Sequence, residues 1–102
     1  MGLPVRRAAK VDANQADIVK GLRRHGCSVL PLHAIGQGCP DLLVARSGNT
    51  MLMEIKDGNK PPSHRKLTPD QEAFHERWHG AITTVCNLDE AILAVKYTLG
   101  VF

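Results

Sequence analysis

Apolar residues in this chain occur in short runs that are separated by polar and turn-forming segments. Residues 13–25 have apolar positions at helical spacing, and Gly26 is suited to end a helix there. Four other runs are short, apolar and bounded by turn residues, which is typical of strands. The pattern therefore predicts strands at 28–32, 41–45, 51–56 and 81–86.

Capping signals predict two further helices. Thr68 precedes Pro69 and Gln71, which matches a helix with a threonine N-cap, proline in the first turn and glutamine at the third position. Asn87 is a suitable cap for a last helix that runs through Leu99. The predicted order is α-β-β-β-α-β-α, a mixed α/β (α+β) fold in one domain over residues 1–102, with residues 1–11 as a basic arm.

A short connection joins the second and third predicted strands. It contains Ser47-Gly48-Asn49, whose turn chemistry predicts an antiparallel hairpin. Asp41 follows a proline at the mouth of the first of these strands, and the hairpin register can bring it toward Glu54. Because side chains alternate along a strand, Glu54 and Lys56 share one face and Ile55 points to the other.

Two carboxylates that approach each other resist ionisation unless a cation shares them. Magnesium suits Asp41 and Glu54, because it takes oxygen ligands and prefers one or two carboxylates plus a substrate phosphate. The backbone carbonyl of Ile55 could be a third ligand. Lys56 could orient or deprotonate a water, or neutralise charge on the phosphate. The alternative, an exposed strand with an ordinary Glu/Lys pair, is favoured by Glu-x-Lys alone but less so with Pro40-Asp41 at hairpin distance.

These motifs resemble those of a known superfamily. They comprise Gly38, Pro40 and Asp41, then Glu54-Ile55-Lys56, then the segment 67–71 that leads to Trp78-His79-Gly80. Together they resemble the PD-(D/E)XK nucleases, and more closely the small VRR-NUC-like members common in phage and bacterial genomes, over residues 12–98. The resemblance implies a restriction-endonuclease-like core, in which a small mixed sheet is flanked by helices, and divalent-metal-dependent DNA cleavage.

The resemblance also implies roles for single residues. It assigns metal binding to Asp41 and Glu54, catalysis to Lys56, and a place near the site to the helical Gln71, with Mg²⁺ or Mn²⁺ as cofactor. Family members commonly carry a glutamate in the first helix, where this chain has Gln15. Gln15 could still contribute a carbonyl oxygen to the metal, or it could close a capping box over residues 12–15.

Basic residues are concentrated around the predicted site. The formal net charge is only +3, but the segment 56–66 alone has four basic residues against one aspartate. We expect DNA phosphates to be bound by the basic loop and the N-terminal arm, through Lys60, His64, Arg65, Lys66, Arg6 and Arg7. The alternative is that these charges only solvate loops. Aromatic residues make up 4% of the chain, which favours duplex or branched DNA over a single strand.

Hydrophobic runs and cysteines indicate where the protein is found in the cell. No apolar run approaches the roughly 20 residues that a membrane span needs, and no signal-peptide pattern is present, so we expect a cytoplasmic protein. The resemblance implies that a bacterium or phage encodes it. The cysteines, Cys27, Cys39 and Cys86, form no metal or disulfide pattern. Small stand-alone members of the family tend to act as homodimers, so the resemblance implies a two-fold assembly.

Two other functions compete with a DNA endonuclease. His75-Glu76-Arg77-Trp78-His79 matches the H-E-x-x-H motif of zinc peptidases, although two solvent-side histidines beside a Phe74/Trp78 core stripe fit a short motif better. Gln15 in place of an acid also suggests a nucleic-acid-binding module that keeps the fold but cleaves poorly. Among these, the arrangement of Asp41, Glu54 and Lys56 favours the metal-dependent endonuclease.

Overall fold

A computed structural model describes residues 12–100, and within them the predicted element order is confirmed. The helices are α1 (Gln15–Arg24), α2 (Pro69–Arg77) and α3 (Leu88–Leu99). The strands are β1 (Ser28–Pro31), β2 (Leu42–Arg46), β3 (Asn49–Ile55) and β4 (Ile82–Val85). A short 3-10 turn, η1 (Pro62–His64), interrupts the predicted loop between β3 and α2.

The strands form one mixed sheet in the order β1-β2-β3-β4. The pairs β1–β2 and β2–β3 are antiparallel, whereas β3 and β4 are parallel. Parallel neighbours require a crossover connection, and here the chain crosses through η1 and α2. β1 lies at the edge of the sheet, where Pro31 is tolerated although it cannot donate a backbone hydrogen bond.

The predicted hairpin between β2 and β3 is confirmed, with a tighter turn than the sequence suggested. Arg46 pairs with Asn49, so the loop contains only Ser47 and Gly48. Both have positive φ, 54° and 79°, as a two-residue type I′ turn requires. As a result β3 begins at Asn49 rather than at residue 51.

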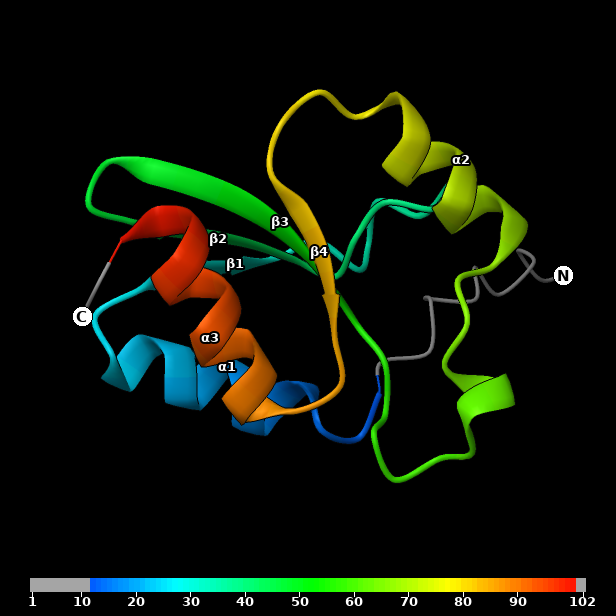
Figure 1. Ribbon diagram of the computed structural model, residues 1–102, viewed down its shortest axis with the longest axis horizontal. Coiled ribbons are helices and arrows are strands. Elements are labelled where there is room, and N and C mark those ends of the chain that lie inside the picture. The colour runs from blue at the N-terminus through cyan, green and yellow to red at the C-terminus, as the bar shows by residue number, and fades with distance from the viewer. Residues whose placement is uncertain (1–11, 101–102) are drawn as a thin grey trace, which may run out of the picture.

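The core lies between the sheet and two helices. Figure 1 shows α1 and α3 side by side below the sheet, with α2 above it and beyond β4. Ile18 and Leu22 from α1 are buried with Val95 from α3 against the inner face of the strands. Met53 belongs to this core, while Glu54 next to it points to the opposite face, as the predicted alternation requires.

α2 is not part of that core. None of its residues is buried, and Trp78 is 44% exposed. The predicted Phe74/Trp78 core stripe is therefore wrong: the two rings stack on each other, with centroids 5.5 Å apart, and neither belongs to the core. Among residues 12–100, none of the helices has both the length and the apolar character that crossing a membrane would require.

Candidate active site

The hairpin places Asp41, which directly precedes β2, beside Glu54 of β3. Leu42 pairs with Met53, so Asp41 lies one step further along, opposite Glu54. The backbone N–H of Ile55 donates to Asp41 Oδ2 at 2.7 Å, which holds this carboxylate beside the end of β3. The predicted approach of the two carboxylates is thus present in the structure.

Glu54 is an acidic group almost excluded from solvent. Its side chain is 3% exposed, and Oε1 has no hydrogen-bond partner among the described residues. Burial, followed by the neighbouring carboxyl group of Asp41, raises the pKa of Glu54 to about 9, although the charge of Lys56 opposes the shift. Glu54 therefore holds a proton near neutral pH unless a cation stabilises its charged form.

Gln71 joins this carboxylate to the lysine of the motif. Lys56 Nζ donates to Gln71 Oε1 at 2.8 Å, and Gln71 Nε2 donates to Glu54 Oε2 at 3.3 Å. The backbone N–H of Thr68 donates to the same Gln71 oxygen at 2.9 Å, and Thr68 Oγ1 accepts from the Gln71 N–H at 3.2 Å. The predicted cap of α2 is therefore a full capping box, and it fixes Gln71 in the site.

Asp41, Glu54, Lys56 and Gln71 line a common cleft of about 260 Å³. Larger hollows of about 500 and 690 Å³ lie elsewhere on the molecule, but none of these four residues lines them. Ionisable and hydrogen-bonding groups that face one another, rather than size, identify the cleft as the candidate active site.

The cleft fits a hard divalent cation. Its donors are mainly carboxylate and amide oxygens, which Mg²⁺ and Mn²⁺ prefer, and one buried oxygen of Glu54 lacks a partner. Within residues 12–100, no three His, Cys, Asp or Glu side chains converge closely enough to enclose an ion. An ion would thus complete its shell with water, backbone or substrate oxygens, as magnesium usually does. The carbonyl of Ile55 as a ligand stays a prediction.

Gln15 is not among the residues that line the cleft. Its side chain is 5% exposed, and Oε1 has no partner within the described part of the chain. It lines a groove between α1 and β1 together with His33, which also borders the cleft. Metal ligation by Gln15 stays a prediction that this placement does not favour.

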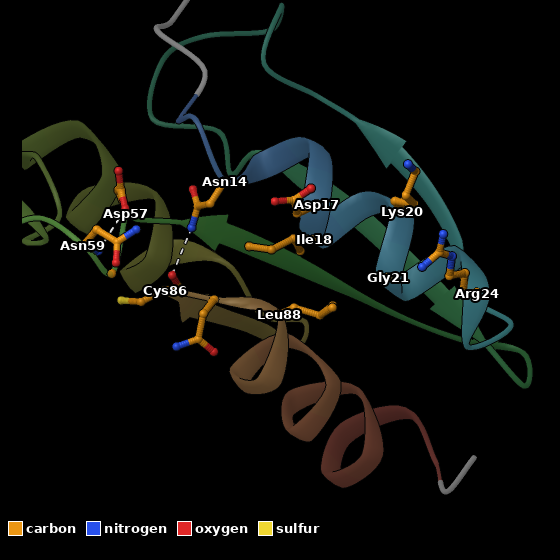
Figure 2. A pocket seen from close by; sticks show the side chains of 12 residues that line it. Asn14, Asp17, Ile18, Lys20, Gly21, Arg24, Asp57, Asn59, Cys86 and Leu88 are labelled. Carbon is orange, nitrogen blue, oxygen red and sulfur yellow. Dashed lines mark hydrogen bonds between the residues drawn. The ribbon is translucent and has the colours of Figure 1, made fainter.

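The predicted capping box at residues 12–15 is wrong. α1 begins at Gln15, and Asn14 at the N-cap makes no capping hydrogen bond with its side chain. Instead Asn14 Nδ2 donates to the backbone carbonyl of Lys56 at 3.2 Å and to that of Cys86 at 2.9 Å. Figure 2 shows Asn14 reaching toward Cys86 from the start of the helix. A long-range contact has replaced the local one.

The predicted phosphate-binding residues differ in exposure and in whether they line the cleft. His64 lines the cleft, Lys60 and Lys66 are exposed, and Arg65 is half-buried. Arg6 and Arg7 lie outside the described residues. The basic loop thus borders the cleft, whereas the part expected of the N-terminal arm stays a prediction.

The peptidase-like motif does not form the geometry that its chemistry needs. α2 ends at Arg77, and Trp78 has an extended backbone, so His79 is not one helical turn after His75. His75 Nδ1 is instead 2.9 Å from the carbonyl oxygen of Gln71. The helix thus ends three residues before Gly80.

Sequence reasoning missed Asp12 as part of the site, and it missed Asn14 and Gly38 as residues that support the site. Asp12 lines the cleft, and Gly38 has a φ of 78°. A Cβ on Gly38 would lie 2.3 Å from the backbone oxygen of Asp70, so the loop approaches the first turn of α2 closely. The glycine was visible in the motif, but the contact spans 32 positions and leaves no local signal.

No family model matches the chain, and no curated protein matches it. Among solved structures, the chain is similar to one described as a VRR_NUC domain. The two share 24% sequence identity with a TM-score of 0.61, and the match covers 84% of this chain and 98% of that chain. Likeness at this identity concerns the fold, and it confirms the fold that the sequence resemblance implied. The chain has the restriction-endonuclease-like fold of a VRR_NUC domain.

Proposed function

We propose that the protein is a Mg²⁺- or Mn²⁺-dependent endonuclease that hydrolyses DNA phosphodiester bonds. The observation that carries this proposal is the convergence of Asp41, Glu54 and Lys56 on one cleft, in which Gln71 joins the lysine to the glutamate. The fold shared with a VRR_NUC domain supports a nuclease-type activity. The exposed basic residues of the loop 56–66 support a nucleic-acid substrate.

Each side chain has a role that its position supports. Asp41 and Glu54 would hold the divalent cation, which supplies charge for the phosphate oxygens and a more acidic water. Lys56 directs its ammonium group into the cleft, where it can orient the attacking water or neutralise charge that develops on the phosphate. Gln71 restricts the position of Lys56 through the 2.8 Å hydrogen bond to Nζ.

The substrate we infer is duplex or branched DNA. The cleft is small and polar, and among the described residues no Phe, Tyr or Trp side chain lines it. Recognition would thus depend on backbone phosphates more than on stacked bases. A homodimer with two such sites could cut two strands of a junction, and we retain this assembly as part of the proposal.

The test is a cleavage assay with supercoiled, flap and four-way-junction DNA, with Mg²⁺ or Mn²⁺ and with EDTA. We expect nicking that needs the metal and that falls by at least about 100-fold in Lys56→Ala, since one electrostatic group in such a site contributes about that much. Nicking at an unchanged rate in Lys56→Ala would refute the assigned mechanism. Binding without cleavage by the wild type would favour the alternative, a DNA-binding module with this fold.

A further inference from the structure

Asp12 is a third carboxylate at the candidate active site. It precedes α1 and lines the same cleft as Asp41, Glu54 and Lys56. The sequence marks this residue only as part of a possible capping box over residues 12–15, and gives no sign that it belongs to the site. Its place in the cleft is a product of the tertiary structure.

Hydrogen bonds from Asn14 explain how Asp12 is placed there. Asn14 Nδ2 joins the start of α1 to the last residue of the Glu54-Ile55-Lys56 motif, through the carbonyl of Lys56, and also to Cys86 after β4. The N–H of Gln15 donates to the carbonyl of Asp12 at 3.0 Å and closes a turn over the intervening residues. Two residues before this anchor, Asp12 is thus held beside the end of β3.

The carboxyl group of Asp12 is partly buried and lies in the electric field of Asp41. Burial first, and then the charge of Asp41, raises the pKa of Asp12, whereas Lys60 and Lys56 lower it. The fold thus places three acidic side chains, Asp12, Asp41 and Glu54, along one cleft. Without a cation such an arrangement costs free energy, and with one it becomes favourable.

A second, independent observation points to a ligand in this cleft. Glu54 is 3% exposed, lines the cleft, and has a buried Oε1 without a partner in the described chain. A buried carboxylate oxygen of this kind is costly unless a donor or cation reaches it. The three carboxylates do not close into a cage within residues 12–100, so Asp12 would contact the ion's water rather than the ion.

We propose that Asp12 is the third acidic residue of the metal site, in the place that the sequence resemblance gives to Gln15. Its carboxylate would accept hydrogen bonds from metal-bound water, as partners outside the direct ligands do in other metal sites. The inference rests on the proposed function, since it assumes that Asp41 and Glu54 hold a divalent cation. Gln15 would then serve packing of α1 against β1, where its side chain lies.

The test is Mn²⁺ binding by the full chain in isothermal titration calorimetry, without DNA. We expect Asp12→Asn to weaken Mn²⁺ affinity roughly tenfold, the lower end of the usual effect of such a partner, and Asp12→Glu to recover part of it. Asp17→Asn is the matched control, because it removes the same charge from an exposed position on α1 outside the cleft. Gln15→Met, similar in length, should leave affinity unchanged. Circular dichroism and thermal melting check that each variant is folded.

The outcomes separate this inference from the proposed function. Wild-type affinity in Asp12→Asn, together with lost binding in Glu54→Gln, would overturn the role of Asp12 and leave the nuclease proposal intact. Weaker Mn²⁺ binding in Gln15→Met, with wild-type affinity in Asp12→Asn, would show that Gln15 and not Asp12 contributes to the metal site. Unchanged Mn²⁺ binding in Glu54→Gln, or no binding by the wild type, would refute both.

Discussion

At the scale of the residue, Gln71 connects folding with the site. Its side-chain oxygen accepts from both Lys56 Nζ and the Thr68 N–H, and its amide group donates to Glu54. The cap that starts α2 therefore also sets the distance between the lysine and the buried carboxylate. The sequence predicted the cap and a place near the site separately, but it did not predict that the same atoms serve both.

Gln71→Leu should separate these two effects when compared with Thr68→Ala. Gln71→Leu removes the contacts to Lys56 and Glu54 together with the acceptor of the Thr68 N–H, and we expect DNA cleavage to fall about 10- to 100-fold. Thr68→Ala removes the cap hydroxyl and should lower the free energy of unfolding by about 1 kcal/mol while retaining most of the activity. Urea denaturation and single-turnover cleavage measure the two quantities. Full activity in Gln71→Leu would contradict the assigned role.

At the scale of the element, α2 is positioned by its first turn and not by burial. None of its residues is buried, yet Gly38 packs so closely on Asp70 that a Cβ would lie 2.3 Å from the backbone oxygen. Gly38 also needs its positive φ of 78°. The loop before β2 therefore supports the helix that carries Gln71.

Gly38→Ala and Gly48→Ala form a matched pair that tests this support. Both glycines have positive φ, 78° and 79°, but a Cβ at Gly48 would meet nothing within 4 Å. We expect Gly48→Ala to cost about 1 kcal/mol of stability from strain alone, with normal cleavage by the folded protein. Gly38→Ala should cost more and reduce cleavage at least about tenfold, because it displaces α2. Equal activities in the two variants would argue against the proposed support.

At the scale of the whole molecule, the residues that form the core are separate from those that line the cleft. α1 and α3 cover one face of the sheet and form the core with it, whereas α2 and the loop 56–66 lie beyond the ends of β3 and β4, away from these two helices (Figure 1). Residues of α2 and of this loop line the cleft. Charges near the cleft are therefore available to a bound DNA backbone without disturbing the core. Lys66 is exposed in the loop, and Lys96 is exposed on α3.

The salt dependence of DNA binding should distinguish a basic residue near the cleft from one on α3. If Lys66 contacts one phosphate, Lys66→Gln should reduce the slope of log affinity against log salt by about 0.9. Lys96→Gln removes the same charge from α3, and its slope should equal that of the wild type. Fluorescence anisotropy with duplex DNA in EDTA measures both, since cleavage is then prevented. Equal slopes in all three proteins would exclude a phosphate contact at Lys66.

The sequence alone determined the features of the structure that depend on residues close together in the chain. The element order follows from local periodicity and caps, and the shared face of Glu54 and Lys56 follows from the alternation of strand side chains. Turn chemistry at Ser47-Gly48 was enough to predict the antiparallel hairpin and so the approach of Asp41 to Glu54. Each of these features is decided within a few positions of the chain.

Only the tertiary structure decided how distant segments complete the site. Asn14 bonds across 42 and 72 positions to Lys56 and Cys86, in place of the local capping box that its sequence favours. Those bonds hold Asp12 at the cleft, and α1 packing carries Gln15 into a neighbouring groove. Through Asn14, two backbone carbonyls in distant segments share a side-chain donor, and such a contact can form only when those segments meet in the folded protein.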